Sequence, residues 1–194
     1  GFFNISTLVG GTGNDSLNGL NIASAWDIDG TNTYAARGRT LNFSAFENLI
    51  GGSDDDTLTL SASQTNNLIG NSGADSVIFN DNATLTGMFD GGADDDTLDF
   101  SRYTTARIVT LNALGSTDGF SGTATGISAT FDNVETILGS SAATDTWNGL
   151  NADARWDVDG TNTYTAINAI TFDNTNHTTR RTVATTTTAL TTGD

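Results

Sequence analysis

Short loops rich in glycine and aspartate are the part of this sequence best suited to chemistry. The first loop, GGTGNDSLN at residues 10–18, matches the pattern G-G-x-G-x-D-x-U-x, where U is a large apolar residue, at every fixed position. Glycine lets backbone carbonyl groups converge, and Ca²⁺ prefers six to eight oxygen ligands. The loop therefore has the residue types of a calcium-binding turn. Its candidate metal ligands are Gly10, Gly11, Gly13 and Asp15.

Three later segments are altered copies of this loop. They end at Asp56, Asp75 and Asp96, which stand 19 and 21 residues apart. Asp or Asn replaces one glycine in each copy, and both residues tolerate left-handed backbone geometry. Two copies place three carboxylates side by side, and a bound cation would relieve their mutual repulsion. The candidate metal ligands of these copies are Gly51, Asp54, Asp56, Gly70, Gly73, Asp75, Gly91, Asp94 and Asp96.

Residues 10–18 resemble the nine-residue repeats of the repeats-in-toxin (RTX) family of secreted bacterial proteins. The resemblance is strong over 10–18, partial over 49–100 and absent elsewhere. It implies that calcium, as the cofactor, lies between the turns of successive coils. It also implies an extracellular location, secreted or at the cell surface. The family carries two such loops per coil and this chain has one, so calcium would be confined to one edge.

A second interpretation of the same aspartates needs no metal. Asp side chains in turns often accept hydrogen bonds from nearby backbone amides. The loops would then be solvated turns whose carboxylates cap the backbone. The sequence leaves both interpretations open.

A long repeat organises the chain. Residues 26–34, WDIDGTNTY, recur as WDVDGTNTY at 156–164, and NGLN at 18–21 recurs at 148–151. We therefore divide the chain into a first repeat at 1–130, a partial second repeat at 131–177 that continues the same structure, and a Thr-rich tail or edge strand at 178–194. Both ends fall inside a repeat, so we expect a window on a longer array.

The shorter step of about 20 residues predicts the fold. Segments such as 56–60, 76–79 and 107–111 alternate apolar and polar residues, as half-buried strands do. The chain has 22 Gly and no Pro, and about 20 residues is the length of one coil of a β-solenoid. We expect an all-β fold, a right-handed parallel β-solenoid of the β-helix or β-roll kind, with Gly/Asp-rich turns along one edge.

Composition excludes several classes of partner. The formal net charge is −16, and a chain this acidic repels phosphate backbones and anionic lipid. There is no Cys, which excludes disulfides and zinc–thiolate sites. No apolar run is long enough to span a membrane. We therefore expect no nucleic acid and no membrane span.

Catalytic residue sets are sparse. The single histidine, His177, lies near the Thr-rich tail, and neither Lys nor Cys is present. Arg102, Tyr103 and Arg107 form a small basic and aromatic cluster, which leaves open a β-helix enzyme acting on acidic polysaccharide, a lyase or epimerase. A carbohydrate-binding adhesin module is the other alternative, but the three tryptophans look core-facing. We expect no enzymatic activity.

The function that follows from these patterns is structural. A stacked rod of coils has open ends, and an open end is an unsatisfied sheet edge. We expect an extracellular, structural or adhesive segment of a large bacterial surface protein that forms a calcium-stabilised rod or filament by end-to-end stacking. Its expected partners are calcium ions, identical subunits or further repeats, and cell-surface or matrix glycans.

Overall fold

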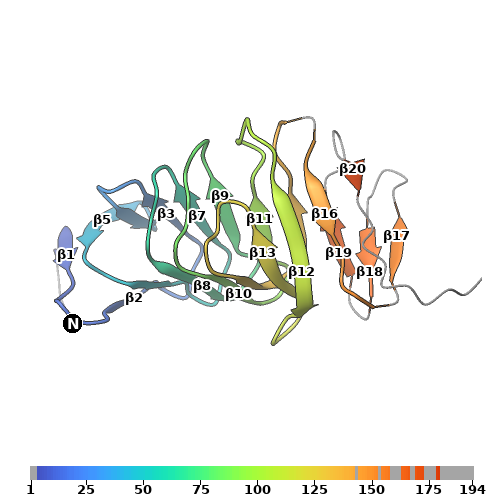
Figure 1. Cartoon of the computed structure of the whole chain (residues 1–194). Helices are drawn as coiled ribbons and strands as arrows, with labels where there is room; N and C mark the ends of the chain where they lie inside the picture. Colours follow the sequence, from blue (N-terminus) through green and yellow to red (C-terminus); the bar gives the residue numbers. More distant parts are fainter. Residues whose placement is uncertain are drawn as a thin grey trace, which may run out of the picture.

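The computed structural model describes residues 4–142, 144–152, 154–157, 163–166, 169–172 and 178–179, and in these residues all regular secondary structure is β-strand. The predicted all-β class is confirmed. The strands form two large sheets, A and B, that extend along the long axis of the molecule (Figure 1). Of the Thr-rich tail, only 178–179 lies within the described residues.

Sheet A has the strand order β1-β5-β4-β3-β7-β9-β11-β15-β19-β18-β17. Its strands are β1 (Thr7–Val9), β3 (Ser24–Ile28), β4 (Thr33–Ala36), β5 (Arg39–Ser44), β7 (Asp56–Leu60), β9 (Ser76–Phe79), β11 (Thr97–Asp99), β15 (Thr136–Leu138), β17 (Arg155–Asp157), β18 (Thr163–Thr165) and β19 (Ala169–Phe172). Sheet B has the order β2-β6-β8-β10-β14-β13-β12-β16-β20. Its strands are β2 (Ser16–Asn18), β6 (Asn48–Ile50), β8 (Asn67–Ser72), β10 (Phe89–Ala93), β12 (Ile108–Leu114), β13 (Phe120–Ala124), β14 (Phe131–Val134), β16 (Thr146–Asn148) and β20 (Thr178–Thr179).

Between β6 and β11 the chain alternates regularly between the sheets. Strands β6, β8 and β10 stack in parallel in sheet B, and β7, β9 and β11 stack in parallel in sheet A. Thr57 pairs with Ser76, which pairs with Thr97, so each step advances about 20 residues. We call one full lap of the chain, which contains one strand of each sheet and the two corners that join them, a rung. The short sequence period is the length of one rung.

Antiparallel excursions interrupt this parallel stacking, and the sequence had not predicted them. Strands β3, β4 and β5 form a meander in sheet A, and β12, β13 and β14 form another in sheet B. The turn between β4 and β5 consists of Arg37 and Gly38, whose φ angles are 49° and 69°. Two central residues with positive φ are typical of the tight type I′ hairpin turn. The chain therefore doubles back within one sheet before it crosses to the other.

The core consists of two facing columns of apolar side chains. In sheet A, Leu58, Val77, Leu98 and Ile137 occupy matching positions of neighbouring strands and are 0–1% exposed. The matching column in sheet B is Leu49, Leu68, Phe89 and Phe131, all fully buried. Alternation along each strand sends every second side chain inward, so the columns build one continuous core.

The long sequence repeat is also a structural repeat. In the first copy Thr7 of β1 pairs with Asn42 of β5, and 129 residues later Thr136 of β15 pairs with Thr171 of β19. In both copies a parallel sheet B pair follows, β2 with β6 and β16 with β20. The second copy begins against the first through the parallel pairs β11–β15 and β12–β16. The two copies therefore follow each other along one axis.

Candidate functional site

The three aspartates of the altered loops lie in one column. Asp56, Asp75 and Asp96 are at the corners that lead into β7, β9 and β11, one rung apart. Their residues are 1%, 0% and 0% exposed. The structure thus brings these three predicted site residues together, as their spacing suggested. The carboxylates are buried inside the corner and do not face solvent.

Each backbone N–H in this column donates a hydrogen bond to a carboxylate of the following rung. The Asp56 N–H donates to Asp75 Oδ1 at 2.7 Å, and the Asp75 N–H donates to Asp96 Oδ1 at 2.8 Å. The Asp96 N–H donates to Glu135 Oε2 at 2.8 Å. We call Asp56, Asp75, Asp96 and Glu135 the carboxylate ladder. It joins consecutive rungs at a corner by side-chain acceptors.

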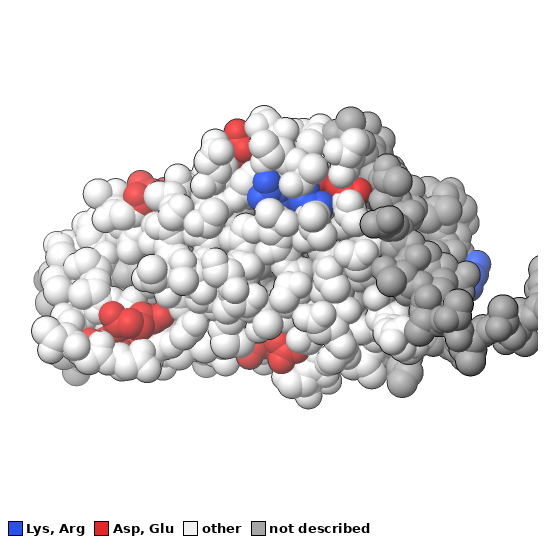
Figure 2. Space-filling view, in the orientation of Figure 1, with Lys and Arg blue, Asp and Glu red and all other residues white. Residues whose placement is uncertain are grey.

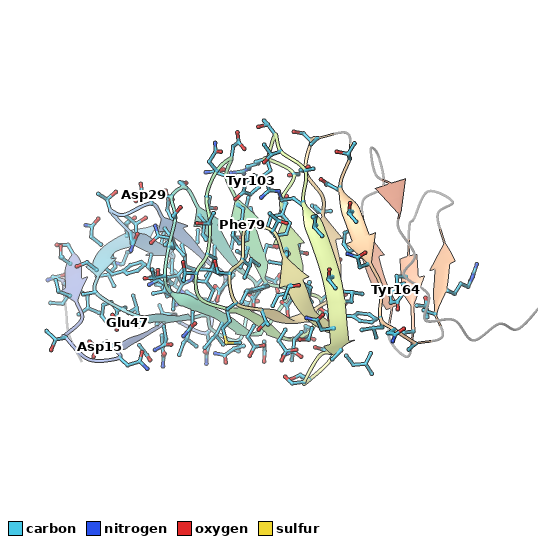
Figure 3. All side chains as sticks on the ribbon, in the orientation of Figure 1. Asp15, Asp29, Glu47, Phe79, Tyr103 and Tyr164 are labelled. Carbon is cyan, nitrogen blue, oxygen red and sulfur yellow. The ribbon has the colours of Figure 1, made fainter. Side chains whose placement is uncertain are left out.

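The opposite corner, which leads into sheet B, uses the same contact twice. The Asp15 N–H donates to Glu47 Oε2 at 2.8 Å, and the Arg107 N–H donates to Asp145 Oδ1 at 2.7 Å. Figure 3 shows Asp15 and Glu47 close together at the N-terminal end. Glu47 and Glu135 were not among the residues predicted from the sequence. The available signal was their position immediately before a strand, where the altered loops have aspartate.

Burial makes the ladder carboxylates weak acids. Burial, with a smaller contribution from the neighbouring carboxylates, raises the pKa of Asp75 to about 7 and that of Asp96 to about 8. Burial likewise raises the pKa of Glu135 to about 7. Asp75 Oδ2, Asp96 Oδ2 and Glu135 Oε1 are buried and have no hydrogen-bond partner among the residues that the structure describes. A buried carboxyl group with an unsatisfied oxygen favours the neutral, protonated form.

The glycines of the altered loops make room for this ladder. A Cβ atom on Gly70 would lie closer than 3.0 Å to Asp75 Oδ2 and to the carbonyl oxygen of Gly91. Gly51 and Gly91 are in the same position relative to Asp56 and Asp96. These three glycines are therefore explained by the close approach of their own carboxylate and of the next rung.

The outer aspartates of the loops cap the backbone of neighbouring rungs. Asp54 Oδ2 accepts from the Ala23 N–H at 3.3 Å, and Asp94 Oδ2 accepts from the Gly73 N–H at 3.2 Å. Both aspartates are exposed. Gly73 has a φ of +101°, a conformation that favours glycine. The loops thus contact each other through carboxylate–amide hydrogen bonds.

In the loop at 10–18, the side chain of the aspartate accepts a hydrogen bond from its own loop. Asp15 Oδ2 accepts from the Gly11 N–H of the same loop at 2.5 Å. Gly10 lies against the carbonyl oxygen of Ala45, whereas Gly13 has open space around it. The loop with the best motif therefore does not share a side-chain ligand set with Asp56, Asp75 and Asp96.

Several groups that the RTX resemblance assigns to calcium take part in hydrogen bonds within the protein. The ladder aspartates accept from backbone amides, and the Gly51 carbonyl oxygen accepts from Asn71 Nδ2 at 3.0 Å. In the described part of the chain, no three His, Cys, Asp or Glu side chains are grouped so that they could hold a metal ion. The contacts present are those of the amide-capping interpretation.

Tyr103 and Arg107 of the basic and aromatic cluster are buried, whereas Arg102 is exposed. The Arg107 guanidinium lies 3.9 Å from the centre of the Tyr103 ring and donates to the carbonyl oxygens of Thr105 and Thr125, at 3.0 and 3.3 Å. Arg107 is only 7% exposed. Arg102, nearby, donates to Asn80 Oδ1 at 2.7 Å. These side chains connect segments of the fold, and their described contacts form no substrate site.

Two further observations bear on the alternatives for function. Trp26 and Trp147 are each 1% exposed, so these two do not form an aromatic row for sugars. The side chain of Trp156 and the whole of His177 lie outside the described residues. On the face drawn in Figure 2, acidic side chains appear at separate places and not as one continuous patch. The described residues contain no helix able to cross a membrane.

Comparisons of the chain with family models, with curated proteins and with solved structures give no match.

Proposed function

We propose that this chain is a segment of an extracellular structural rod, built as a right-handed parallel β-solenoid with antiparallel excursions. Parallel strands joined through a crossover are almost always right-handed, which supports this handedness. The strands lie across the long axis and are stacked along it (Figure 1). In this architecture each rung completes the hydrogen bonding and the core of its neighbour.

The observation that carries the proposal is the joining of the two copies of the long repeat. Strands β11 and β12 of the first copy pair in parallel with β15 and β16 of the second. Such a head-to-tail contact adds units along one axis and does not close into a ring. The same contact can be used again by a further repeat or by an identical subunit, and the rod would lengthen with each one.

The extracellular location and the adhesive role rest on the resemblance of residues 10–18 to a secreted family and on the repetitive architecture. Cell-surface or matrix glycans remain proposed partners of the outer faces. Calcium is left out of the rod-forming mechanism, because the ladder carboxylates already accept from backbone amides. No described contact of Arg102, Tyr103 or Arg107 favours the enzymatic alternative.

An antibody raised against the purified chain tests this function on intact source cells. Gold-labelled antibody should decorate filaments or matrix outside the cell without permeabilisation. An antibody against a cytosolic enzyme, applied to the same cells, is the control and should label only permeabilised cells. Labelling that requires permeabilisation would contradict an extracellular rod.

A further inference from the structure

We propose that the N-terminal end of the molecule is a docking site for a rung of another copy of the same repeat, a rung with the chemistry of β11 and β12. This inference rests on the proposed function and names the partner of the rod end. A groove of about 820 Å³ opens at this end. We call it the end groove. Its lining includes Asn4, Leu8, Leu17, Asn18, Leu20 and Tyr34.

Both sheets end at this groove with an open edge. Among the described strands, β1 is the last strand of sheet A and β2 is the last strand of sheet B. The inner edge of each is paired, β1 with β5 and β2 with β6. An open strand edge presents N–H and C=O groups to an incoming strand. The end groove therefore offers two edges at once, with an apolar floor between them.

The second copy of the repeat shows what fits this surface. Strands β15 and β16 are the counterparts of β1 and β2, and they are covered by β11 and β12 in parallel register. The Thr136 N–H donates to the Asp96 carbonyl oxygen at 2.9 Å, and the Phe100 N–H donates to that of Leu138 at 2.9 Å. In sheet B the Thr146 N–H donates to the Arg107 carbonyl oxygen at 2.9 Å.

Apolar side chains at the end groove are more exposed than their counterparts in the second copy, which a rung covers. Leu8 of β1 is half-buried, whereas Ile137, its counterpart in β15, is fully buried. Leu20 is 56% exposed, whereas Leu150 is half-buried. Covering the end groove with a rung would remove this apolar surface from water, which favours docking.

The aromatic part of the groove is preformed. Tyr34 is half-buried, and its hydroxyl oxygen accepts from the Leu20 N–H at 2.9 Å. In the second copy the Tyr164 hydroxyl accepts from the Leu150 N–H at 2.8 Å in the same way. Tyr164 is 1% exposed, and the ring of Phe120 packs against it with a centroid distance of 5.8 Å. Phe120 lies on β13, in the hairpin that follows β12, so we expect the docked rung with its hairpin to place this aromatic ring on Tyr34.

Two asparagines give the groove a polar specificity. Asn148 Nδ2 donates to Thr110 Oγ1 of β12 at 3.0 Å, and Asn18 is its exposed counterpart. Asn133 is buried, and its Oδ1 accepts a hydrogen bond from the Thr117 N–H at 2.7 Å. Its counterpart Asn4 is exposed. Asn4 and Asn133 share positive φ angles of 58° and 53°. At Asn4, the backbone of the end groove thus has the same positive φ as its covered counterpart.

A fusion protein tests the partner directly. Residues 88–130 of this chain, placed immediately before Phe2, would put a new β11–β12 rung at the 129-residue spacing seen between the copies. We expect the amides of β1 and β2 to exchange with deuterium at least about tenfold more slowly than in the original chain, because the new rung covers them. We also expect the melting temperature to rise.

The matched control is the same fusion with Asp at the added copies of Leu98 and Val109, which are inward-facing and buried in the original rung. The control should leave exchange at β1 and β2 unchanged. Equal exchange in the fusion and in the original chain would overturn the proposal. The original chain could also dimerise as its concentration rises and protect β1 and β2 from exchange. That result would overturn the proposal, because the occupant of the end groove would then be the far end of a second molecule. Neither result depends on the cellular location, so a failure here is distinct from a failure of the extracellular rod.

Discussion

The backbone N–H of Asp75 donates a 2.8 Å hydrogen bond to Oδ1 of Asp96, the residue at the same corner of the next rung. Both residues are fully buried. A buried backbone amide needs an acceptor, and here a carboxylate supplies it where the rungs meet at a corner. The aspartates that gave the loops the look of a calcium site therefore serve as internal acceptors.

The stability of the protein should fall as the pH rises from about 4 to about 8. Burial raises the pKa of Asp75 and Glu135 to about 7 and that of Asp96 to about 8, above their ordinary values of 3.8 for Asp and 4.5 for Glu. In this range the folded protein binds more protons than the unfolded chain, so the free energy of unfolding decreases with pH. Thermal unfolding followed by circular dichroism should give a higher melting temperature near pH 5 than near pH 8.5.

The matched variant for this pH dependence is Asp96→Asn. It removes the ladder carboxyl with the highest pKa and keeps an oxygen that can accept from the Asp75 N–H. Its melting temperature should change less between the two pH values than that of the original chain. An equally steep dependence in both proteins would show that the ladder is not its source.

The acceptor role of Asp75 can be separated from its charge. Asp75→Ala leaves the buried Asp56 N–H without its 2.7 Å partner and should cost about 1–3 kcal/mol of unfolding free energy. Asp75→Asn retains an oxygen acceptor and should be close to neutral near pH 5, where the buried carboxyl group of the original chain is protonated and uncharged like the amide. Urea unfolding of the two variants measures the difference, and equal losses in both would exclude the acceptor role.

Glycine should be required at the ladder and dispensable in the outer loop. Gly70→Ala places a methyl group against Asp75 Oδ2 and the Gly91 carbonyl oxygen, and we expect it to destabilise the protein by about 1–3 kcal/mol. Gly13→Ala is the control, because, apart from its chain neighbours, no described residue has an atom within 4 Å of the added Cβ. Its effect should stay within about 0.5 kcal/mol. Comparable losses would mean that the ladder does not restrict position 70.

Calcium should have little effect on folding. Removing calcium with a chelator should leave the circular dichroism spectrum unchanged and the melting temperature within about 2 °C, since about 1 kcal/mol corresponds to 2–4 °C at this size. Magnesium at the same concentration controls for charge screening of the exposed aspartates. A rise of more than about 4 °C with millimolar calcium, absent with magnesium, would show specific binding and restore the RTX-type interpretation.

The parts of the fold that were predictable from the sequence are those encoded by local patterns. The apolar and polar alternation of 56–60 and 76–79 indicated strands, and the spacing of Asp56, Asp75 and Asp96 indicated one corner per step. The excursions were missed, because a hairpin and a crossover can begin with the same alternating strand. A local signal was Gly38 between two strand-like segments, because glycine favours the positive φ that a tight hairpin turn requires.

For the candidate site, the sequence by itself determined the all-β class, the step of about 20 residues and the alignment of three aspartates, because each follows from side-chain periodicity and turn composition. Only the tertiary structure decided which way those carboxylates point. A carboxylate turns toward a cation or toward an amide according to which groups the neighbouring rung presents, and for Asp75 that rung is 19 residues away along the chain. Glu135 belongs to the same ladder but lies 39 residues beyond Asp96. The excursion of β12, β13 and β14 lies between them, so local sequence does not predict this contact.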